Sequence, residues 1–185
     1  MIIAQKLRHD NRAEYLLYMW QVEEILRLFH CDIDRLSAAH LSRFHVAPAE
    51  AEAMRQWYAQ LCSMMRSEGK MERGHLQINE TTLTGLEDLH HRLLASPDFP
   101  TYRARYERVL PYIVELRAKS GEQRDSADTA ELRPLFDFLY GIMTLRLQKR
   151  PISDETARAA RDVADFLALL SELWKKDRED GLPDL

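Results

Sequence analysis

The residues best suited to chemistry are a glutamate and a histidine three positions apart, Glu87 and His90. Side chains at this spacing share one face of a helix, and Glu-x-x-His pairs supply ligands to di-iron centres in helical bundles. Such a centre needs the motif on two helices and a glutamate from each of two more. A second pair at this spacing, Glu72 and His75, encloses Gly74 in an expected loop. We therefore interpret Glu87 and His90 as surface charge beside a packed histidine, and we expect no metal and no cofactor.

Motifs for nucleophilic catalysis or phosphate binding do not occur in the sequence. It holds no G-x-S-x-G, P-loop, G-x-G-x-x-G or zinc-finger spacing, the patterns that position a nucleophile, a phosphate or a metal. A site assembled from distant residues needs no motif, so the absence of these motifs counts only against the familiar classes of site. We predict no catalytic residue, and the pattern favours a protein that is not an enzyme.

A third set of candidates consists of polar and aromatic side chains close to apolar helix positions. Buried charges are stable only when they are paired and hydrogen-bonded, so some of these residues are expected to form an interhelical network that fixes helix register. The alternative is a small polar pocket between helices, lined by the same residues. The set comprises Tyr18, Trp20, Glu23, Glu24, Arg66, Glu115, Arg117 and Arg146.

The composition is that of an ordinary globular protein, since 45% of the 185 residues are hydrophobic and 30% are charged. The formal net charge of -4 argues against nucleic acid as a partner, because duplex binding depends on clustered positive charge. No segment has the roughly 18 apolar residues of a membrane span. Cys31 and Cys62 are interpreted as buried free thiols. We expect a cytoplasmic protein with no membrane partner.

Apolar spacing predicts helices along the whole chain and no strand. The first helix is expected over about 4–30, where six consecutive apolar residues from Tyr15 to Trp20 need neighbours on every side. Asp32, Pro48 and Ser153 suit the first positions of later helices. Further helices are expected at about 32–44, 48–68, 101–119, 130–149 and 153–176, with one more ending near 94. The sequence thus predicts an all-α bundle of about six or seven helices with a long central N-terminal helix.

We expect a single helical domain over residues 1–185. The segment 120–129, SGEQRDSADT, has the composition of a linker and is predicted to be a mobile loop, and residues 179–185 are predicted to be a disordered tail. Pro111 falls inside the helix expected over 101–119. An interior proline removes a backbone hydrogen bond and clashes with the carbonyl four residues back, so we predict a kink near Glu107 to Leu110.

Several segments of the chain are similar to those of one protein family. They are MIIAQ, AEYLLYMWQVEE, WYAQL followed by MMRSEG, GHLQIN, IVELRAKSG, and LYG followed by LRLQK. Together they resemble, from Met1 to about Leu173, a family of about this length from Bacteroidetes that is described as a domain of unknown function. The resemblance implies an all-helical single domain from a bacterial cytoplasm. It implies no activity, and it assigns no functional residue.

The surplus of aromatic and methionine residues gives the remaining indication of function. Such residues can leave an apolar patch on the surface of a bundle, where a second copy or another protein binds. We therefore predict a non-enzymatic protein that acts through protein-protein interaction or self-association, with a homodimer or a protein partner. The alternative is an enzyme or small-ligand binder with a polar pocket between helices.

Overall fold

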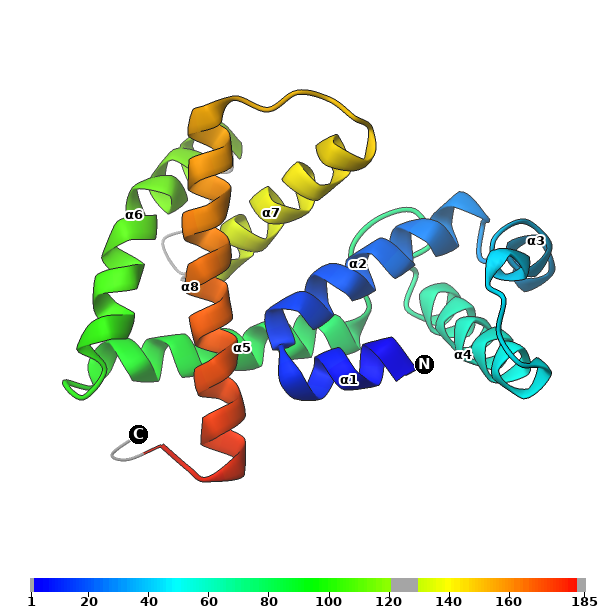
Figure 1. The fold of residues 1–185 in the computed structure, drawn as a ribbon, viewed down its shortest axis with the longest axis horizontal. Coiled ribbons are helices and arrows are strands. Elements are labelled where there is room, and N and C mark those ends of the chain that lie inside the picture. Colours follow the sequence, from blue (N-terminus) through cyan, green and yellow to red (C-terminus); the bar gives the residue numbers. More distant parts are fainter. Residues whose placement is uncertain (1, 121–129, 183–185) are drawn as a thin grey trace. The chain divides into compact units, whose positions relative to one another are not determined.

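The computed structural model describes residues 2–120 and 130–182, and the regular secondary structure in that part of the chain is helical throughout (Figure 1). The all-α prediction is therefore confirmed. The elements are α1 (Ile2–Asp10), α2 (Arg12–Leu28), α3 (Ile33–Ala39), the short 3-10 helix η1 (Leu41–Arg43), α4 (Pro48–Ser67), α5 (Gln77–Ala95), α6 (Pro100–Ser120), α7 (Leu132–Leu147) and α8 (Asp154–Glu179).

The prediction of one long central N-terminal helix is wrong, because the chain leaves the helical conformation at Asn11, between α1 and α2. Asp and Asn side chains form local hydrogen bonds that compete with those of a helix interior. Asp10 and Asn11 are adjacent, and the Asp10 carboxylate lies 2.9 Å from the His9 imidazole. The apolar run from Tyr15 to Trp20 falls in α2, where both of these end residues are buried.

Contacts between Cα atoms divide the chain into two compact units, each of which is described by itself. The first unit comprises Met1–Arg8 and Glu14–Thr82, and the second comprises His9–Ala13 and Leu83–Leu185. The single domain expected over residues 1–185 stays a prediction.

In the first unit, the chain reverses sharply after α2 so that α3 can pack against α4. The reversal uses His30 and Cys31 in the left-handed region, with φ of 52° and 54°. Asp32 then caps α3, since its carboxylate accepts the backbone N–H groups of the second and third helical residues. Leu36 and Met65 are fully buried in the resulting core.

In the second unit, α6, α7 and α8 pack against one another. Ile113, Phe136 and Phe166 come from these three helices and are at most 1% exposed. The Ser153 hydroxyl accepts the backbone N–H of the third residue of α8 at 3.1 Å, which confirms the predicted cap. Pro111 lies inside α6, and the ribbon of this helix is bent along its length (Figure 1).

Two predicted segments fall partly outside the described residues. Positions 121–129 of the predicted loop and 183–185 of the predicted tail are not among them. The described part of that tail begins in α8, which ends at Glu179. None of the described helices combines the length and the apolar character that crossing a membrane requires.

Candidate functional site

A fully buried carboxylate, that of Glu23 on α2, is the centre of the most concentrated polar cluster in the first unit. Its Oε1 accepts the backbone N–H of Leu76 at 2.9 Å and the Asn79 side-chain amide at 2.6 Å. Its Oε2 lies 2.6 Å from Nδ1 of His75. Both carboxylate oxygens are therefore satisfied, as a buried charge requires. We call Trp20, Glu23, His75, Leu76 and Asn79 the Glu23 cluster.

The start of α5 explains why a carboxylate lies here. The backbone carbonyl of Leu76 accepts the amides of Asn79 and Glu80, so Leu76 occupies the capping position of the helix. A leucine side chain cannot accept a hydrogen bond, and the first amides of a helix need an acceptor. Glu23 supplies that acceptor from another helix, and its negative charge suits the positive end of the helix dipole.

The imidazole of His75 is held from two directions. Its Nδ1 contacts the Glu23 carboxylate, and its ring stacks on Trp20 with centroids 4.1 Å apart and planes 15° apart. The side chain remains 21% exposed. A carboxylate that binds one ring nitrogen fixes the tautomer and leaves the other nitrogen as a base or a metal ligand. Among the described residues, however, no group of three His, Cys, Asp or Glu side chains could hold a metal ion.

Asn79 adds one unusual feature to the cluster. The residue is 1% exposed, and within the described chain its Oδ1 has no hydrogen-bond partner. Buried acceptors of this kind are commonly satisfied by an internal water molecule. The Glu23 cluster is therefore a polar interior site that can bind a water molecule at Asn79.

The structure brings only some of the predicted polar residues together. Trp20 and Glu23 both belong to the Glu23 cluster, whereas Glu24 is exposed and forms an ion pair with Arg27 at 2.5 Å. Tyr18 is half-buried, and burial raises the pKa of its hydroxyl. Arg66 is exposed and donates to the Cys31 carbonyl at 2.6 Å. In the first unit, the predicted set is thus dispersed over separate contacts.

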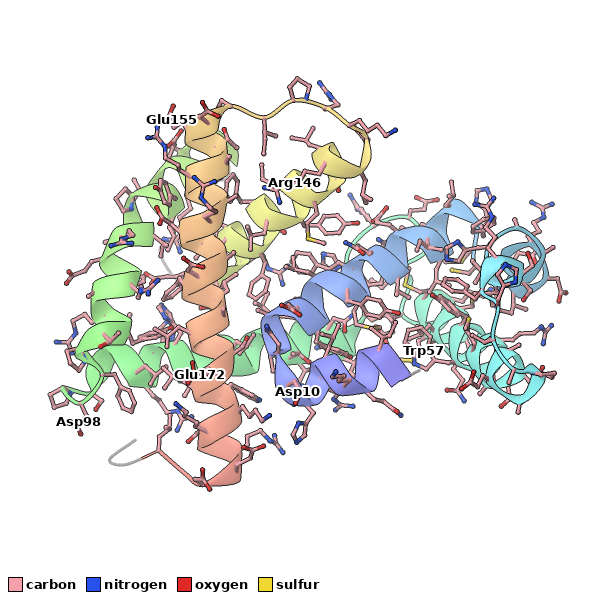
Figure 2. All side chains as sticks on the ribbon, in the orientation of Figure 1. Asp10, Trp57, Asp98, Arg146, Glu155 and Glu172 are labelled. Carbon is pink, nitrogen blue, oxygen red and sulfur yellow. The ribbon has the colours of Figure 1, made fainter. Side chains whose placement is uncertain are left out.

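The other three members of that set lie in the second unit and are exposed there. Glu115 forms an ion pair with Lys119, one turn along α6. Arg117 donates to the backbone carbonyl of Ala130 at 2.7 Å. Arg146, labelled in Figure 2, is on α7. None of these three residues is buried, so they do not form the interior network or pocket considered for them.

The interpretation of Glu87 as surface charge is wrong, because its side chain is buried on α5 and only 8% of the residue is exposed. Its two carboxylate oxygens accept the backbone N–H groups of Leu132 at 2.7 Å and Glu131 at 3.3 Å. These amides belong to the start of α7, whose capping residue Glu131 makes no side-chain cap of its own. Burial raises the pKa of Glu87, and these two hydrogen bonds oppose the shift.

His90 is fully buried one turn further along α5, as expected for a packed histidine, and it connects three side chains. Its Nδ1 lies 2.6 Å from the Tyr102 hydroxyl and its Nε2 lies 3.1 Å from the Glu131 carboxylate. Tyr106 donates to the same carboxylate at 2.6 Å. We call Glu87, His90, Tyr102, Tyr106 and Glu131 the His90 network.

The pKa shifts in the His90 network define where its protons lie. Burial lowers the pKa of His90 and raises the pKa values of Tyr102 and Tyr106. Burial alone would raise the pKa of Glu131, but hydrogen bonds from Tyr106 and His90 lower it overall. A neutral His90 then accepts from Tyr102 and donates to ionised Glu131, so every member is satisfied. The network stabilises the fold and presents no free nucleophile.

Sequence reasoning missed His75, Asn79 and Glu131 as members of these clusters. A usable signal was present at the start of each helix, because Leu76 has no capping side chain and Glu131 precedes a helix that begins with leucine. Such a start indicates that the capping acceptor comes from another part of the chain, but it does not identify which residue supplies it. Glu23 and Glu87 are 53 and 45 positions away from the amides that they accept.

Comparison with known proteins identifies a family for this chain. No curated protein and no solved structure matches the chain. The model of the family described as Domain of unknown function (DUF4924) matches residues 1–181, nearly the whole chain. The protein belongs to this family.

Proposed function

We propose that the protein acts by self-association through the outer face of α6. The observation that carries this proposal is a pair of apolar side chains one turn apart, Leu110 and Val114, which are 37% and 61% exposed. Glu107 and Arg117 extend the same face in both directions, at spacings of three residues from the apolar pair. We call these four residues the α6 seam. Spacings of three and four residues place side chains in one stripe along a helix.

A neighbouring face of α6 is already in use within the second unit. Val109 and Ile113 are at most 1% exposed, and α6 packs there against α7 and α8. The α6 seam is therefore not the face by which this helix joins the core of the second unit. A large exposed apolar residue beside another of its kind is a common feature of protein interaction surfaces.

The charges of the α6 seam favour a second copy of the chain as the partner. When two copies of α6 run antiparallel and cross at Tyr112, Leu110 of one copy lies opposite Val114 of the other. The same arrangement places Glu107 opposite Arg117 at both ends of the contact. Glu107 has no ion pair among the described residues, and Arg117 donates to the backbone carbonyl of Ala130.

The expected dimer is weak. A contact of two helices along one stripe buries less than the roughly 1,200 Å² typical of stable interfaces. Exposed ion pairs add at most about 1 kcal/mol each, so the seam charges set orientation more than affinity. We therefore expect an equilibrium between monomer and dimer in the micromolar range of protein concentration.

The test is sedimentation velocity over a series of protein concentrations. We expect the wild-type sedimentation coefficient to rise with concentration and Val114→Glu to remain a monomer, because the substitution buries an unpaired charge in the contact. Leu147→Glu is the matched control, since Leu147 is 76% exposed on α7 and lies outside the α6 seam. A monomeric wild type, or a Val114→Glu protein that associates like the wild type, would overturn the proposal.

A cytoplasmic location belongs to the same proposal. Cys31 and Cys62 are buried free thiols, and burial raises the pKa of the Cys62 thiol to about 11. Proteins of reducing compartments commonly keep their thiols in this state. Fractionation of the producing cells, with detection of the chain in each fraction, tests the location.

A further inference from the structure

The first unit contains a pocket that neither the Glu23 cluster nor the α6 seam uses. It lies where α1, α2, α4 and the start of α5 meet, and its volume is ≈ 220 Å³. Trp57, labelled in Figure 2, contributes to its wall from α4. The pocket is formed entirely by residues of the first unit.

The interior of the pocket is apolar. Met19 and Leu61 are 2% and 6% exposed, and Trp57 and Met64 are half-buried around them. Methionine side chains adapt to ligands of different shape, and an indole ring offers a flat apolar surface. An apolar ligand body therefore finds favourable contacts on several sides.

The rim of the pocket is polar and positively charged. Gln5 and Arg8 lie three residues apart on α1, and Gln60 approaches from α4. All three are exposed, and among the described residues none of their side chains has a hydrogen bond or an ion pair. No carboxylate lines the described pocket, so the Arg8 guanidinium has no anion beside it there.

We propose that this pocket binds a small amphipathic carboxylate, with its apolar body against Trp57 and the two methionines and its carboxylate on Arg8. A guanidinium can donate two parallel hydrogen bonds to a carboxylate, a geometry that an ammonium group does not offer. The amides of Gln5 and Gln60 can donate to the same group. The charge complementarity excludes cationic ligands from the class that this site takes.

The volume limits the size of the ligand. A cavity of about 150 Å³ accommodates benzene, and pockets for drug-sized molecules start at about 300 Å³. With ≈ 220 Å³, the pocket fits one aromatic ring with a short side chain, or an alkyl chain of about eight carbon atoms. Octanoate and 3-phenylpropanoate are therefore suitable probes.

Isothermal titration calorimetry with the full chain tests the proposal. We expect octanoate and 3-phenylpropanoate to bind, and octylamine, which has the same chain and the opposite charge, not to bind. Arg8→Gln should weaken octanoate binding by about tenfold or more, because a hydrogen-bonded charge pair is lost. Arg43→Gln is the matched control, since Arg43 is an exposed arginine of the first unit on η1, away from the pocket.

A second variant separates the pocket from the charge. Met64→Trp fills the apolar interior and leaves Arg8 in place, so octanoate binding should be lost while circular dichroism stays that of the wild type. Equal binding of octanoate and octylamine, unchanged octanoate affinity in Arg8→Gln, or no heat with either acid would each overturn the proposal. Because the readout is a small-molecule titration, its result is independent of whether the α6 seam associates.

Discussion

At the residue scale, Glu23 and Glu87 have the same structural role in different units. Each carboxylate is buried and accepts backbone N–H groups at the start of a helix that has no capping side chain of its own. Glu23 also lies 2.6 Å from Nδ1 of His75, and Glu87 is one turn away from His90 along α5. When the capping side chain comes from another helix, it links the two helices. The loss of that one side chain then removes several hydrogen bonds at once.

Replacement of Glu23 is expected to destabilise the protein strongly. Glu23→Ala leaves the Leu76 amide, the Asn79 amide and His75 without their acceptor, and the loss of a buried charged partner costs about 3 kcal/mol or more. Glu23→Gln keeps one acceptor oxygen and should cost about half as much. The free energy of unfolding from urea denaturation measures both effects.

The neighbouring glutamate provides the control for this series. Glu24 is exposed and pairs with Arg27, which keeps its backbone acceptors Lys70 and Gly74 when Glu24 is replaced, so Glu24→Gln should change the free energy of unfolding by at most about 1 kcal/mol. If Glu23→Ala and Glu24→Gln destabilise the protein equally, the Glu23 cluster does not contribute as described.

The buried His90 makes stability dependent on pH in a defined direction. Burial lowers its pKa below the ordinary 6.5, so the unfolded chain takes up a proton at a higher pH than the folded chain. The contribution of neutral His90 is fully present above about pH 6.5 and is lost as the pH falls through the lower pKa of the folded state. We expect the free energy of unfolding to decrease as the pH is lowered from about 7 to about 5.5.

The variant His90→Gln should reduce this pH dependence, because glutamine can replace both hydrogen bonds, to Tyr102 and to Glu131, without titrating. His45→Gln, at an exposed position, should retain the wild-type slope of unfolding free energy against pH. A His90→Gln slope equal to that of the wild type would contradict the assignment. The pKa of Glu87 is raised, so this residue makes the free energy of unfolding fall as the pH rises, opposite to the effect of His90. Glu87 is present in the wild type and in both variants, so its effect cancels when their slopes are compared.

At the scale of helices, the sequence predicts those helix starts whose capping residue directly precedes or begins the helix. Asp32, Pro48 and Ser153 begin their helices as expected, because a cap is formed by residues within one turn of each other. The break at Asn11 was missed, because the apolar pattern continues across it from α1 to α2. Asp10 and Asn11 are the residues that indicate a helix end here, but the helical spacing of the apolar residues on both sides favours a continuous helix.

The polar clusters are predictable only in part from the sequence, because they depend on which helices pack against each other. Periodicity identifies which face of a helix is buried, and on that basis the sequence places Trp20 and Glu23 beside an apolar stripe; the structure shows both residues buried on α2. Periodicity does not identify which other helix meets that face. His75 and Asn79 are therefore found only when α2 and α5 are seen together.

At the scale of the whole molecule, the chain passes between the two units only within helices. The crossings lie between residues 8 and 9 in α1, between 13 and 14 in α2, and between 82 and 83 in α5. Boundaries of independent domains usually fall in exposed linkers, where few contacts cross. A boundary inside continuous helices favours the single domain that the sequence predicts.

We therefore expect the whole chain to unfold in one cooperative transition. Tryptophan fluorescence reports on Trp20 and Trp57 in the first unit and on Trp174 in the second, and far-ultraviolet circular dichroism reports on helices of both. The two urea curves should coincide, and the calorimetric and van't Hoff enthalpies should be equal. The buried Ser171 hydroxyl of α8 accepts the Ala13 amide at 3.0 Å within the second unit. Substitutions in either unit, Glu23→Gln in the first or Ser171→Ala in the second, should each shift the entire transition. Two separate transitions, with Glu23→Gln moving only one of them, would show two independent domains instead.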